Sequence, residues 1–357
     1  MKIKKVIAVV LLLGVLAGAA GAAWAYQQLR TPRIHQHADE YVEIPKGSSP
    51  NEVLARLTRL GIIGPGTAIR LYVRLTGRGP RFKAGEYRFP SPITPLEVIE
   101  KLEEGEQRLN RLVIVEGWTR WDIADLLARI PELKLENPQQ ALALLDDPSL
   151  ISDLDPEARD LEGYLFPDTY SFPPETDARG VVRNATQRFR EVWNDLIKNQ
   201  GGPPNRSVRE IVTVASLIET EAKLADERPL VASVIYNRLR RGMTLGIDST
   251  VIYASKMAGK WRNDGKVYLS DLQRDSPYNT RKVSGLPPGP IASPGRSALE
   301  AALRPAQTDY LYYVREPSRN DGAHNFYASE TEFQRGVEAL REWERSRNAN
   351  EAVGAPR

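Results

Sequence analysis

The longest apolar stretch of the chain lies near its beginning. Three lysines within the first five residues precede 21 uncharged residues at positions 6–26. As a helix that rises about 1.5 Å per residue, this stretch spans about 30 Å, the thickness of the hydrocarbon core of a bilayer. We therefore expect residues 1–27 to form a cytoplasmic tip and a single transmembrane helix, with the lysines on the cytoplasmic side.

A cleaved signal peptide is the alternative interpretation of the same residues. Small side chains at Ala22, Ala23 and Ala25 would suit a signal peptidase. However, the apolar region of a signal peptide usually has only about 7–15 residues, so the length of this stretch favours an uncleaved anchor. Under either interpretation, the rest of the chain is exported from the cytoplasm. The expected location is the cell inner membrane, with the larger part of the chain in the periplasm.

A strand–turn–helix pattern begins after a polar linker at residues 28–40. Apolar and polar residues alternate at positions 41–44, as in a strand with one buried face, and a turn follows. Ser49 then precedes a proline and stands three residues before Glu52, which is the signature of a capping box at a helix N-terminus. The pattern predicts one strand followed by one amphipathic helix.

The same pattern recurs further along the chain. Residues 85–89 alternate like a strand, and Thr94 with Glu97 forms a second capping-box pair around a proline. Residues 68–75, between the two copies, have the spacing of another helix. Together these elements predict a small α+β module at residues 41–106, which is too small for a deep cleft and suits binding better than catalysis.

The next 241 residues, 107–347, are predicted to form one larger α+β domain, and residues 348–357 a disordered tail. Gly, Pro, Ser and Asn are dense between positions 255 and 296, so this region should consist mostly of loops. The other patterns predict strands at 112–115 and 311–314, and helices at 119–127, 138–145, 181–198, 207–225, 227–241 and 329–347.

Composition narrows the chemistry that the chain can perform. The 49 Lys and Arg nearly balance the 46 Asp and Glu, and the two signs are interleaved, so nothing indicates a nucleic-acid partner. The sequence has no Cys, which excludes thiol catalysis and Cys-ligated metals. Two of its three His lie in the linker, which disfavours a His-based triad or metal cage. Carboxylates are the best candidates for chemistry, and no cofactor or metal is expected.

Two carboxylates on the predicted helix 207–225 have different neighbours. Glu219 has Lys223 one turn ahead, which favours an ordinary ionised carboxylate at the helix surface. Glu221 has apolar residues one turn before and after it, and no cation on its own face. An apolar environment raises the pKa of a carboxyl group and can make it a proton donor near neutral pH. The spacing alone leaves Glu221 as either such a donor or a plain surface residue.

Two other features have both a functional and a structural interpretation. Residues 161–170, LEGYLFPDTY, combine aromatic rings with carboxylates. This combination suits the faces and hydroxyls of a sugar, but also a tight turn whose rings fill a core. His324 could bind a ligand, although a lone His is more often a hydrogen-bonded structural residue.

The chain resembles the endolytic murein transglycosylases, also called the YceG-like family. The resemblance covers nearly the whole chain and identifies residues 41–106 as a LysM-like module. Two departures are Gly246-Ile247, where the family usually has Gln and a small hydroxyl residue, and Ser249, where it usually has Pro. The segments that carry the resemblance are, in order, LEGYLFPDTY from Leu161, VASLIETEA from Val214, DERPLVASVIYNRLRRGM from Asp226, DSTVIYA from Asp248, YNT from Tyr278, GLPPGPIASPG from Gly285 and HNF from His324.

The resemblance implies a membrane-anchored lytic transglycosylase, a lyase that acts inside peptidoglycan glycan strands. Such an enzyme breaks the MurNAc–GlcNAc bond without water and leaves a 1,6-anhydroMurNAc end. The catalytic Glu of the family is the second of a Glu-x-Glu pair, which falls on Glu221. Trimming of new strands also implies proximity to peptidoglycan synthases. The candidate substrate-binding residues of the cleft are Asp168, Tyr170, Asn237, Asp248, Tyr253 and Asn325.

Two other functions remain open from the sequence. A non-catalytic scaffold would need only the anchor and the LysM-like module, and would bind peptidoglycan without cleaving it. A lysozyme-like hydrolase would use the same Glu but admit water, and would leave reducing ends. The products distinguish all three possibilities.

Overall fold

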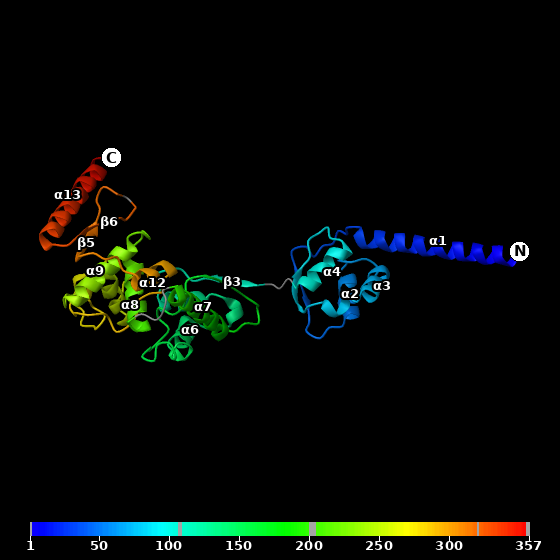
Figure 1. Ribbon diagram of the computed structural model, residues 1–357, viewed down its shortest axis with the longest axis horizontal. Coiled ribbons are helices and arrows are strands. Elements are labelled where there is room, and N and C mark those ends of the chain that lie inside the picture. The colour runs from blue at the N-terminus through cyan, green and yellow to red at the C-terminus, as the bar shows by residue number, and fades with distance from the viewer. Residues whose placement is uncertain (1, 106–108, 200–204, 320, 355–357) are drawn as a thin grey trace. The chain divides into compact units, whose positions relative to one another are not determined.

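The computed structural model describes residues 2–105, 109–199, 205–319 and 321–354, and the chain divides into two compact units, Met1–Asn110 and Arg111–Arg357 (Figure 1). Both units contain more helix than strand, and the described strands pair two by two. The α+β class predicted from the sequence is therefore confirmed.

The first unit contains the duplicated pattern that the sequence predicts. Strands β1 and β2 pair antiparallel, with Tyr41 opposite Arg88 and Ile44 opposite Gly85. Helices from both copies bury their apolar faces in one core with these strands. The elements are β1 Tyr41–Ile44, α2 Pro50–Arg59, α3 Thr67–Thr76, the 3-10 turn Gly79–Arg81, β2 Gly85–Arg88 and α4 Pro95–Glu104.

Both predicted capping boxes are confirmed. The Ser49 backbone N–H donates to Glu52, and the Glu52 backbone N–H donates back to the Ser49 hydroxyl. Thr94 and Glu97 make the same reciprocal pair at the start of α4. Each box satisfies backbone donors that a helix N-terminus otherwise leaves free, so local sequence fixes where these helices begin.

Helix α1, Lys2–Arg30, precedes this module. Residues 28–40, predicted to be a linker, are partly integrated into the unit, because Leu29 is buried in its core and Arg33 pairs with Ile93 through the backbone. Across the side chains that the structure describes, which omit 2–6 and 8–10 of α1, we find no helix that combines the length and the apolar character needed to traverse a membrane.

The second unit begins with the predicted helices α5, α6 and α7, all of which are confirmed. The predicted helix 207–225 is shorter, because the backbone of Ala222 is extended and α8 ends at Glu221. The elements are β3 Asn110–Val113, α5 Arg120–Ala128, α6 Pro138–Leu145, β4 Thr169–Phe172, α7 Ala178–Asn199, α8 Val208–Glu221, α9 Arg228–Arg240, α10 Asp248–Met257, α11 Leu269–Leu272, α12 Arg296–Leu303, β5 Tyr312–Arg315, β6 His324–Tyr327 and α13 Glu330–Gly354, with 3-10 turns at Pro131–Leu133 and Pro148–Leu150.

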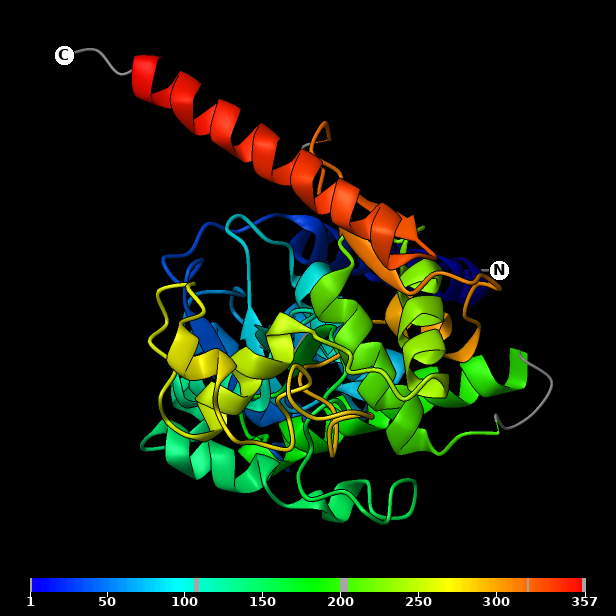
Figure 2. The same ribbon diagram turned by 90° about the vertical axis from the view of Figure 1, so that its left-hand side faces the viewer.

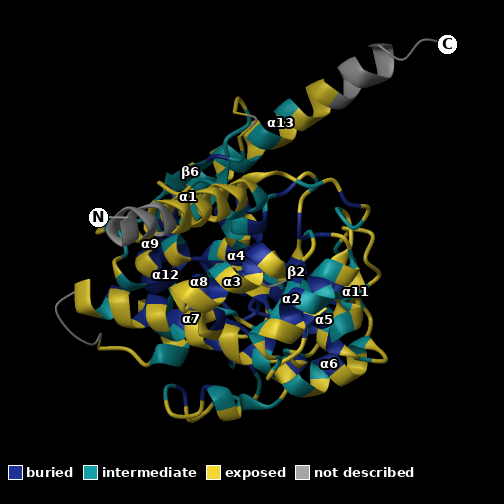
Figure 3. Cartoon of the chain, turned by 90° about the vertical axis from the view of Figure 1, so that its right-hand side faces the viewer, coloured by how far each residue is buried: buried dark blue, intermediate teal, exposed yellow. Residues whose placement is uncertain are grey.

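Helix α8 lies at the centre of this unit, in contact with α9, α10 and α12. Every residue from Ile211 to Ile218 is buried, including Thr213 and Ser216, so the middle of the helix is enclosed on all sides. Figure 3 colours each described residue of the chain by its burial. A helix that is apolar nearly all round belongs in a core rather than at a surface. More of this helix is therefore buried than the single apolar face expected from the sequence would bury.

The end of the chain forms a hairpin covered by a helix. Strands β5 and β6 pair antiparallel, with Tyr313 opposite Phe326. Tyr312 and Tyr327 on these strands contact Phe333 of α13, which extends beyond the rest of its unit (Figure 2). Helix α13 continues to Gly354, so residues 348–354 of the predicted disordered tail are helical, while residues 355–357 lie outside the described part of the chain.

Candidate active site

Glu221 is the last residue of the buried helix α8. The apolar sequence before it fixes the helix in the core, and the extended backbone of Ala222 ends the helix directly after it. The C-terminus of a helix carries a partial negative charge, which disfavours a second negative charge there. A carboxyl group at this position is therefore held rigidly and is harder to ionise than one in water.

The Glu221 carboxyl group accepts a hydrogen bond from the Tyr313 hydroxyl, 2.8 Å from Oε2. Burial raises its pKa above the ordinary value, and the negative charge of Asp248 acts in the same direction. The hydrogen bond from Tyr313 and the nearby Ser249 hydroxyl and His324 oppose this shift without cancelling it. The carboxyl group consequently keeps its proton to a higher pH than a solvated Glu, as a general acid requires.

The β5–β6 hairpin brings two aromatic side chains to this position. Tyr313 and His324 lie edge to face with ring centres 5.4 Å apart. Glu227, which is buried, accepts from the His324 backbone N–H at 2.8 Å and lies 2.9 Å from His324 Nδ1. His324 thus has the hydrogen-bonded structural environment that was one of its two interpretations, and it also faces the candidate acid.

Glu219 is placed differently from what the sequence predicts. Because α8 ends at Glu221, Lys223 does not follow it on a helix, and Glu219 pairs with Arg228 instead, with Arg228 Nη2 2.8 Å from its Oε1. The Gly295 backbone N–H donates to Oε2 at 2.9 Å, and only 5% of the Glu219 side chain is exposed. The expectation of a half-solvated surface carboxylate is wrong. Burial raises the pKa of this group as well, but its oxygens hold α8, α9 and α12 together.

Among the predicted substrate-binding residues, Asp248 is near enough to Glu221 for its negative charge to raise the pKa of that carboxyl group. It is the first residue of α10, and its carboxylate accepts from Arg281 Nε at 2.5 Å. More than half of its side chain is exposed, at 54%. Asp248 is therefore both near the candidate acid and open to solvent.

The other five candidates make contacts elsewhere in the unit. Asp168 pairs with Arg188, and the Asn325 amide donates to Glu316. The remaining three are buried, and their polar atoms already have protein partners. The Tyr170 hydroxyl donates to the Phe166 carbonyl, the Asn237 amide to the carbonyls of Thr308 and Tyr310, and the Tyr253 hydroxyl to Glu162. A role for these five in the cleft stays a prediction.

Residues from distant parts of the chain that approach Glu221 were not identified from the sequence. Tyr313 lies 92 positions further along the chain, and its only local signal was the strand pattern at 311–314. Ser249 was noticed as a departure from the family, not as a neighbour of the acid. Neither contact can be read from local spacing, because each depends on how the hairpin and α10 pack against α8.

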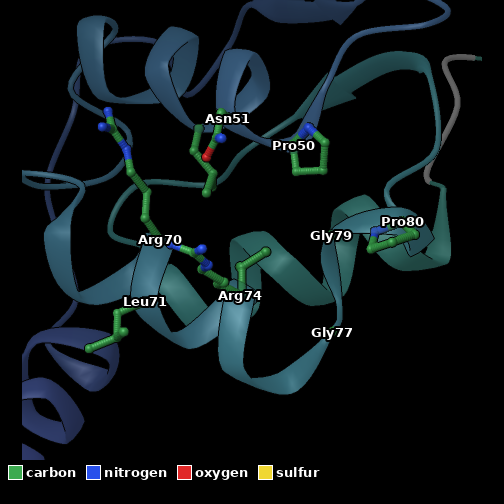
Figure 4. A pocket seen from close by; sticks show the side chains of 10 residues that line it. Pro50, Asn51, Arg70, Leu71, Arg74, Gly77, Gly79 and Pro80 are labelled. Carbon is green, nitrogen blue, oxygen red and sulfur yellow. The ribbon is translucent and has the colours of Figure 1, made fainter.

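The first unit has a pocket of its own, of about 800 Å³. It lies between α2 and the segment that runs from α3 through the turn at Gly77 to Pro80. Figure 4 shows Arg70 and Arg74 extending from α3, with Asn51 of α2 nearby. The pocket therefore combines apolar walls with donors that suit a polar ligand.

Comparisons with known proteins bear on both units. The model of the YceG-like family matches residues 42–339. A Bacillus subtilis (strain 168) protein named endolytic murein transglycosylase is 36% identical over 292 residues, 76% of this chain and 78% of that protein. A Streptococcus pneumoniae (strain R6) protein of the same name is 30% identical over 84% of this chain, which spans 59% of that relative. A crystal structure of a yceG-like protein from Listeria monocytogenes covers 83% of this chain and 98% of its own at 34% identity, with a TM-score of 0.54.

Proposed function

This chain belongs to the YceG-like family, and from that premise we propose that it is an endolytic murein transglycosylase whose catalytic acid and base is Glu221. The enzyme cleaves the MurNAc–GlcNAc bond within peptidoglycan glycan strands and produces 1,6-anhydroMurNAc ends. The observation that carries the assignment of Glu221 is its environment, in which a carboxyl group with a raised pKa lies at the end of a fixed helix beside Asp248.

The reaction needs one carboxyl group in two protonation states. Protonated Glu221 gives its proton to the glycosidic oxygen while the bond from that oxygen to C1 of MurNAc breaks. The carboxylate then takes the proton of the MurNAc C6 hydroxyl as that oxygen bonds to C1. The ring closes, Glu221 is protonated again, and no water is consumed. General acid–base catalysis of this kind contributes about 10²–10⁴-fold in rate.

Different neighbours of Glu221 stabilise its protonated form and its ionised form. Burial and Asp248 favour the protonated acid that begins the reaction. The hydrogen bond from Tyr313 and the nearby Ser249 hydroxyl favour the carboxylate that forms next. A catalytic carboxyl group needs both, because it gives up a proton in one step and takes one back in the next. Most glycoside hydrolases divide these tasks between two carboxyl groups, whereas here the substrate supplies the nucleophile.

The decisive experiment compares Glu221→Gln with Glu219→Gln on purified glycan strands, with the products identified by mass spectrometry. We expect Glu221→Gln to lower the formation of anhydro ends by at least about 100-fold. Glu219→Gln should lower stability but retain the same product, and Glu300→Gln at an exposed position of α12 serves as the folding control. Retention of activity by Glu221→Gln would refute the assignment. Reducing ends would instead indicate a hydrolase, and binding without cleavage a scaffold.

We also propose that residues 6–26 attach the enzyme to the inner membrane with its larger unit in the periplasm. The support is the 21-residue uncharged run that follows three lysines. Removal of residues 1–27 should move the expressed protein from the membrane fraction to the soluble fraction. A full-length chain found only in the soluble fraction would contradict this proposal. Such an anchor would place the enzyme near peptidoglycan synthases.

A LysM-like role for residues 41–106 is the remaining proposal. Its support is the strand–helix–helix–strand order and the pocket beside α2 and α3. We expect Asn51→Ala to weaken binding of the full chain to glycan strands while leaving the chemical step unchanged. Unaltered binding in a pull-down with insoluble peptidoglycan would count against it.

A further inference from the structure

The larger unit has a pocket of about 260 Å³ between α5 and the C-terminal end of α10. Two tryptophans line it, Trp121 of α5 and Trp261 of the loop that follows α10. Charged side chains of the same two helices complete the lining, among them Asp122, Asp125 and Lys256. Pockets for drug-sized ligands usually have about 300–1,000 Å³, so this two-tryptophan pocket suits a smaller group such as one sugar ring.

The local sequence explains how Trp261 reaches this pocket. Gly259 has a φ of 62°, in the left-handed region that favours glycine. The Gly259 N–H donates to the Lys256 carbonyl and the Lys260 N–H to the Ser255 carbonyl, each at 2.9 Å. This pair of hydrogen bonds is a Schellman motif, which ends α10 and reverses the chain. The reversed chain then places Trp261 opposite α5.

The two tryptophans differ in what holds them. Trp121 packs against the hydrophobic core of its unit, and its ring centre lies 5.1 Å from that of Tyr253. Trp261 is half-buried, yet it belongs to neither hydrophobic core, and within the described part of the chain no other ring and no cation contacts its ring. An indole ring that the core does not use is available to a ligand.

The polar groups of the pocket favour an uncharged ligand. Lys256 Nζ lies 3.2 Å from Asp122 Oδ2, so these two charges compensate each other. Asp125 is exposed, and among the described residues its carboxylate has no hydrogen bond or ion pair. A free carboxylate accepts hydrogen bonds from hydroxyl groups and repels other anions. A sugar ring such as GlcNAc, which has C–H faces for the indole and hydroxyls for Asp125, therefore fits better than MurNAc with its lactyl carboxylate.

Helix α10 connects this pocket to the candidate catalytic residue. At the first turn of α10, Ser249 accepts a hydrogen bond at 2.8 Å from Thr220, the residue before Glu221. Lys256, which lines the pocket, follows Ser249 by seven positions, almost two full turns, and so lies on the same face of the helix. Seven residues correspond to about 10 Å along the helix axis, a length comparable to one disaccharide repeat of a glycan.

We propose that the two-tryptophan pocket is a subsite for a GlcNAc ring of the glycan strand, on which Trp261 stacks while Asp125 accepts hydrogen bonds from its hydroxyl groups. Trp121 forms the opposite wall. The inference rests on the proposed function, because it takes the ligand to be the glycan substrate. An enzyme that cuts inside a strand must hold the strand away from the cleaved bond as well as at it, and this pocket provides such a hold at the far end of α10.

The test follows the indole N–H signals of the full-length chain by NMR while chitotetraose, an uncharged oligomer of GlcNAc, is added. The Glu221→Gln variant is used so that the oligomer is not cleaved, and Trp261→Phe assigns the signal of Trp261. The chain has six Trp, none of them in residues 41–106, so the LysM-like module contributes no signal. We expect the Trp261 and Trp121 signals to shift with one common saturation curve, and the signal of Trp343 in α13 to stay in place.

Variants of the lining then measure what each side chain contributes. Trp261→Ala should raise the Kd that the Trp121 signal reports by about tenfold, the loss expected for one stacked ring, whereas Trp261→Tyr should retain most of the affinity. Asp125→Ala should raise the Kd several-fold, because it removes an acceptor. Met257→Ala, at an exposed position of α10 outside the pocket lining, is the matched control and should leave the Kd unchanged.

Two results of the titration would overturn the proposal. One is a Trp261 signal that does not move at millimolar chitotetraose. The other is an equal response to choline, which would indicate a site for a cation. An unchanged Kd in Asp125→Ala would remove Asp125 from the subsite.

The second readout is the formation of anhydro ends from glycan strands of different lengths by the otherwise wild-type chain. Trp261→Ala removes binding that is equal before and during the reaction, so it should raise KM for long strands about tenfold and leave kcat unchanged. Strands too short to reach from Glu221 to the pocket should not respond. Sugar binding at Trp261 without anhydro ends would refute the proposed function alone, whereas anhydro ends with an unshifted Trp261 signal would refute the subsite alone.

Discussion

The hydrogen bond between Tyr313 and Glu221 allows the most specific prediction about the candidate active site. Tyr313→Phe removes only the hydroxyl oxygen and leaves the ring in its contacts with His324 and Phe326. The lost hydrogen bond, 2.8 Å long, favours the ionised form of Glu221, so its loss should raise the pKa of that carboxyl group. The proton would then be held more tightly, and the carboxyl group would be a weaker acid.

The size of this change follows from the strength of such a bond. A hydrogen bond to a charged group contributes about 1.5–3 kcal/mol, and one pKa unit corresponds to about 1.4 kcal/mol. The expected rise in the pKa of Glu221 is therefore about 1–2 units. Because the reaction begins with the protonated acid, the basic limb of the kcat/KM profile should move upward by that amount. The maximal rate should fall about tenfold, since the carboxylate also loses its fixed orientation.

The assay measures anhydro ends released from purified glycan strands between about pH 4 and 9, a range that covers the ordinary Glu value and the expected rise. Tyr312→Phe is the matched control, because Tyr312 is the preceding residue on the strand and contacts α13 rather than Glu221. Its profile should coincide with that of the wild type. A basic limb that moves downward in Tyr313→Phe, or does not move, would refute the reasoning about Glu221.

Three further predictions concern stability. Burial raises the pKa of Glu162 from 4.5 to about 8, so the unfolded chain loses this proton first as pH rises. Folding stability should therefore fall between about pH 4.5 and 8, by no more than about 5 kcal/mol, and Glu162→Gln should flatten that dependence in urea titrations at several pH values. Arg228→Met leaves Glu219 buried and unpaired and should cost about 3–5 kcal/mol by urea unfolding, whereas Arg296→Met, at an exposed ion pair, should cost less than about 1 kcal/mol. Thr94→Ala removes the cap of α4 and should cost about 1 kcal/mol in the same measurement, and an unchanged midpoint would show that the cap is not needed.

Local features of the fold could be predicted from the sequence because their causes lie within a few residues. The capping boxes at Ser49 and Thr94 need only a residue and its third neighbour, and both are present. The end of α8 was placed too late, because nothing in the residues after Glu221 forbids another helical turn. The extended backbone of Ala222 ends the helix there. The disordered tail was likewise expected too early, since α13 continues to Gly354.

In the candidate site, too, the features set by nearby residues could be predicted from the sequence, and those set by residues distant along the chain could not. The apolar neighbours of Glu221 on its own helix indicated a raised pKa, and its burial agrees with that reasoning. The reasoning failed for Glu219, whose partner Arg228 belongs to the next helix and lies nine positions away. Tyr313 and Ser249 were out of reach for the same reason. A carboxyl group owes its chemistry to residues that the fold, rather than the local sequence, brings to it.

The short strand β5 has one more consequence. Successive side chains of a strand point to opposite sides, so Tyr312 packs on Phe333 of α13 while Tyr313 reaches Glu221. The C-terminal helix and the candidate catalytic carboxyl group therefore contact two neighbouring residues of one strand. A truncation or a docked protein that displaces α13 would therefore also shift β5, and with it the hydroxyl group that Tyr313 directs at Glu221.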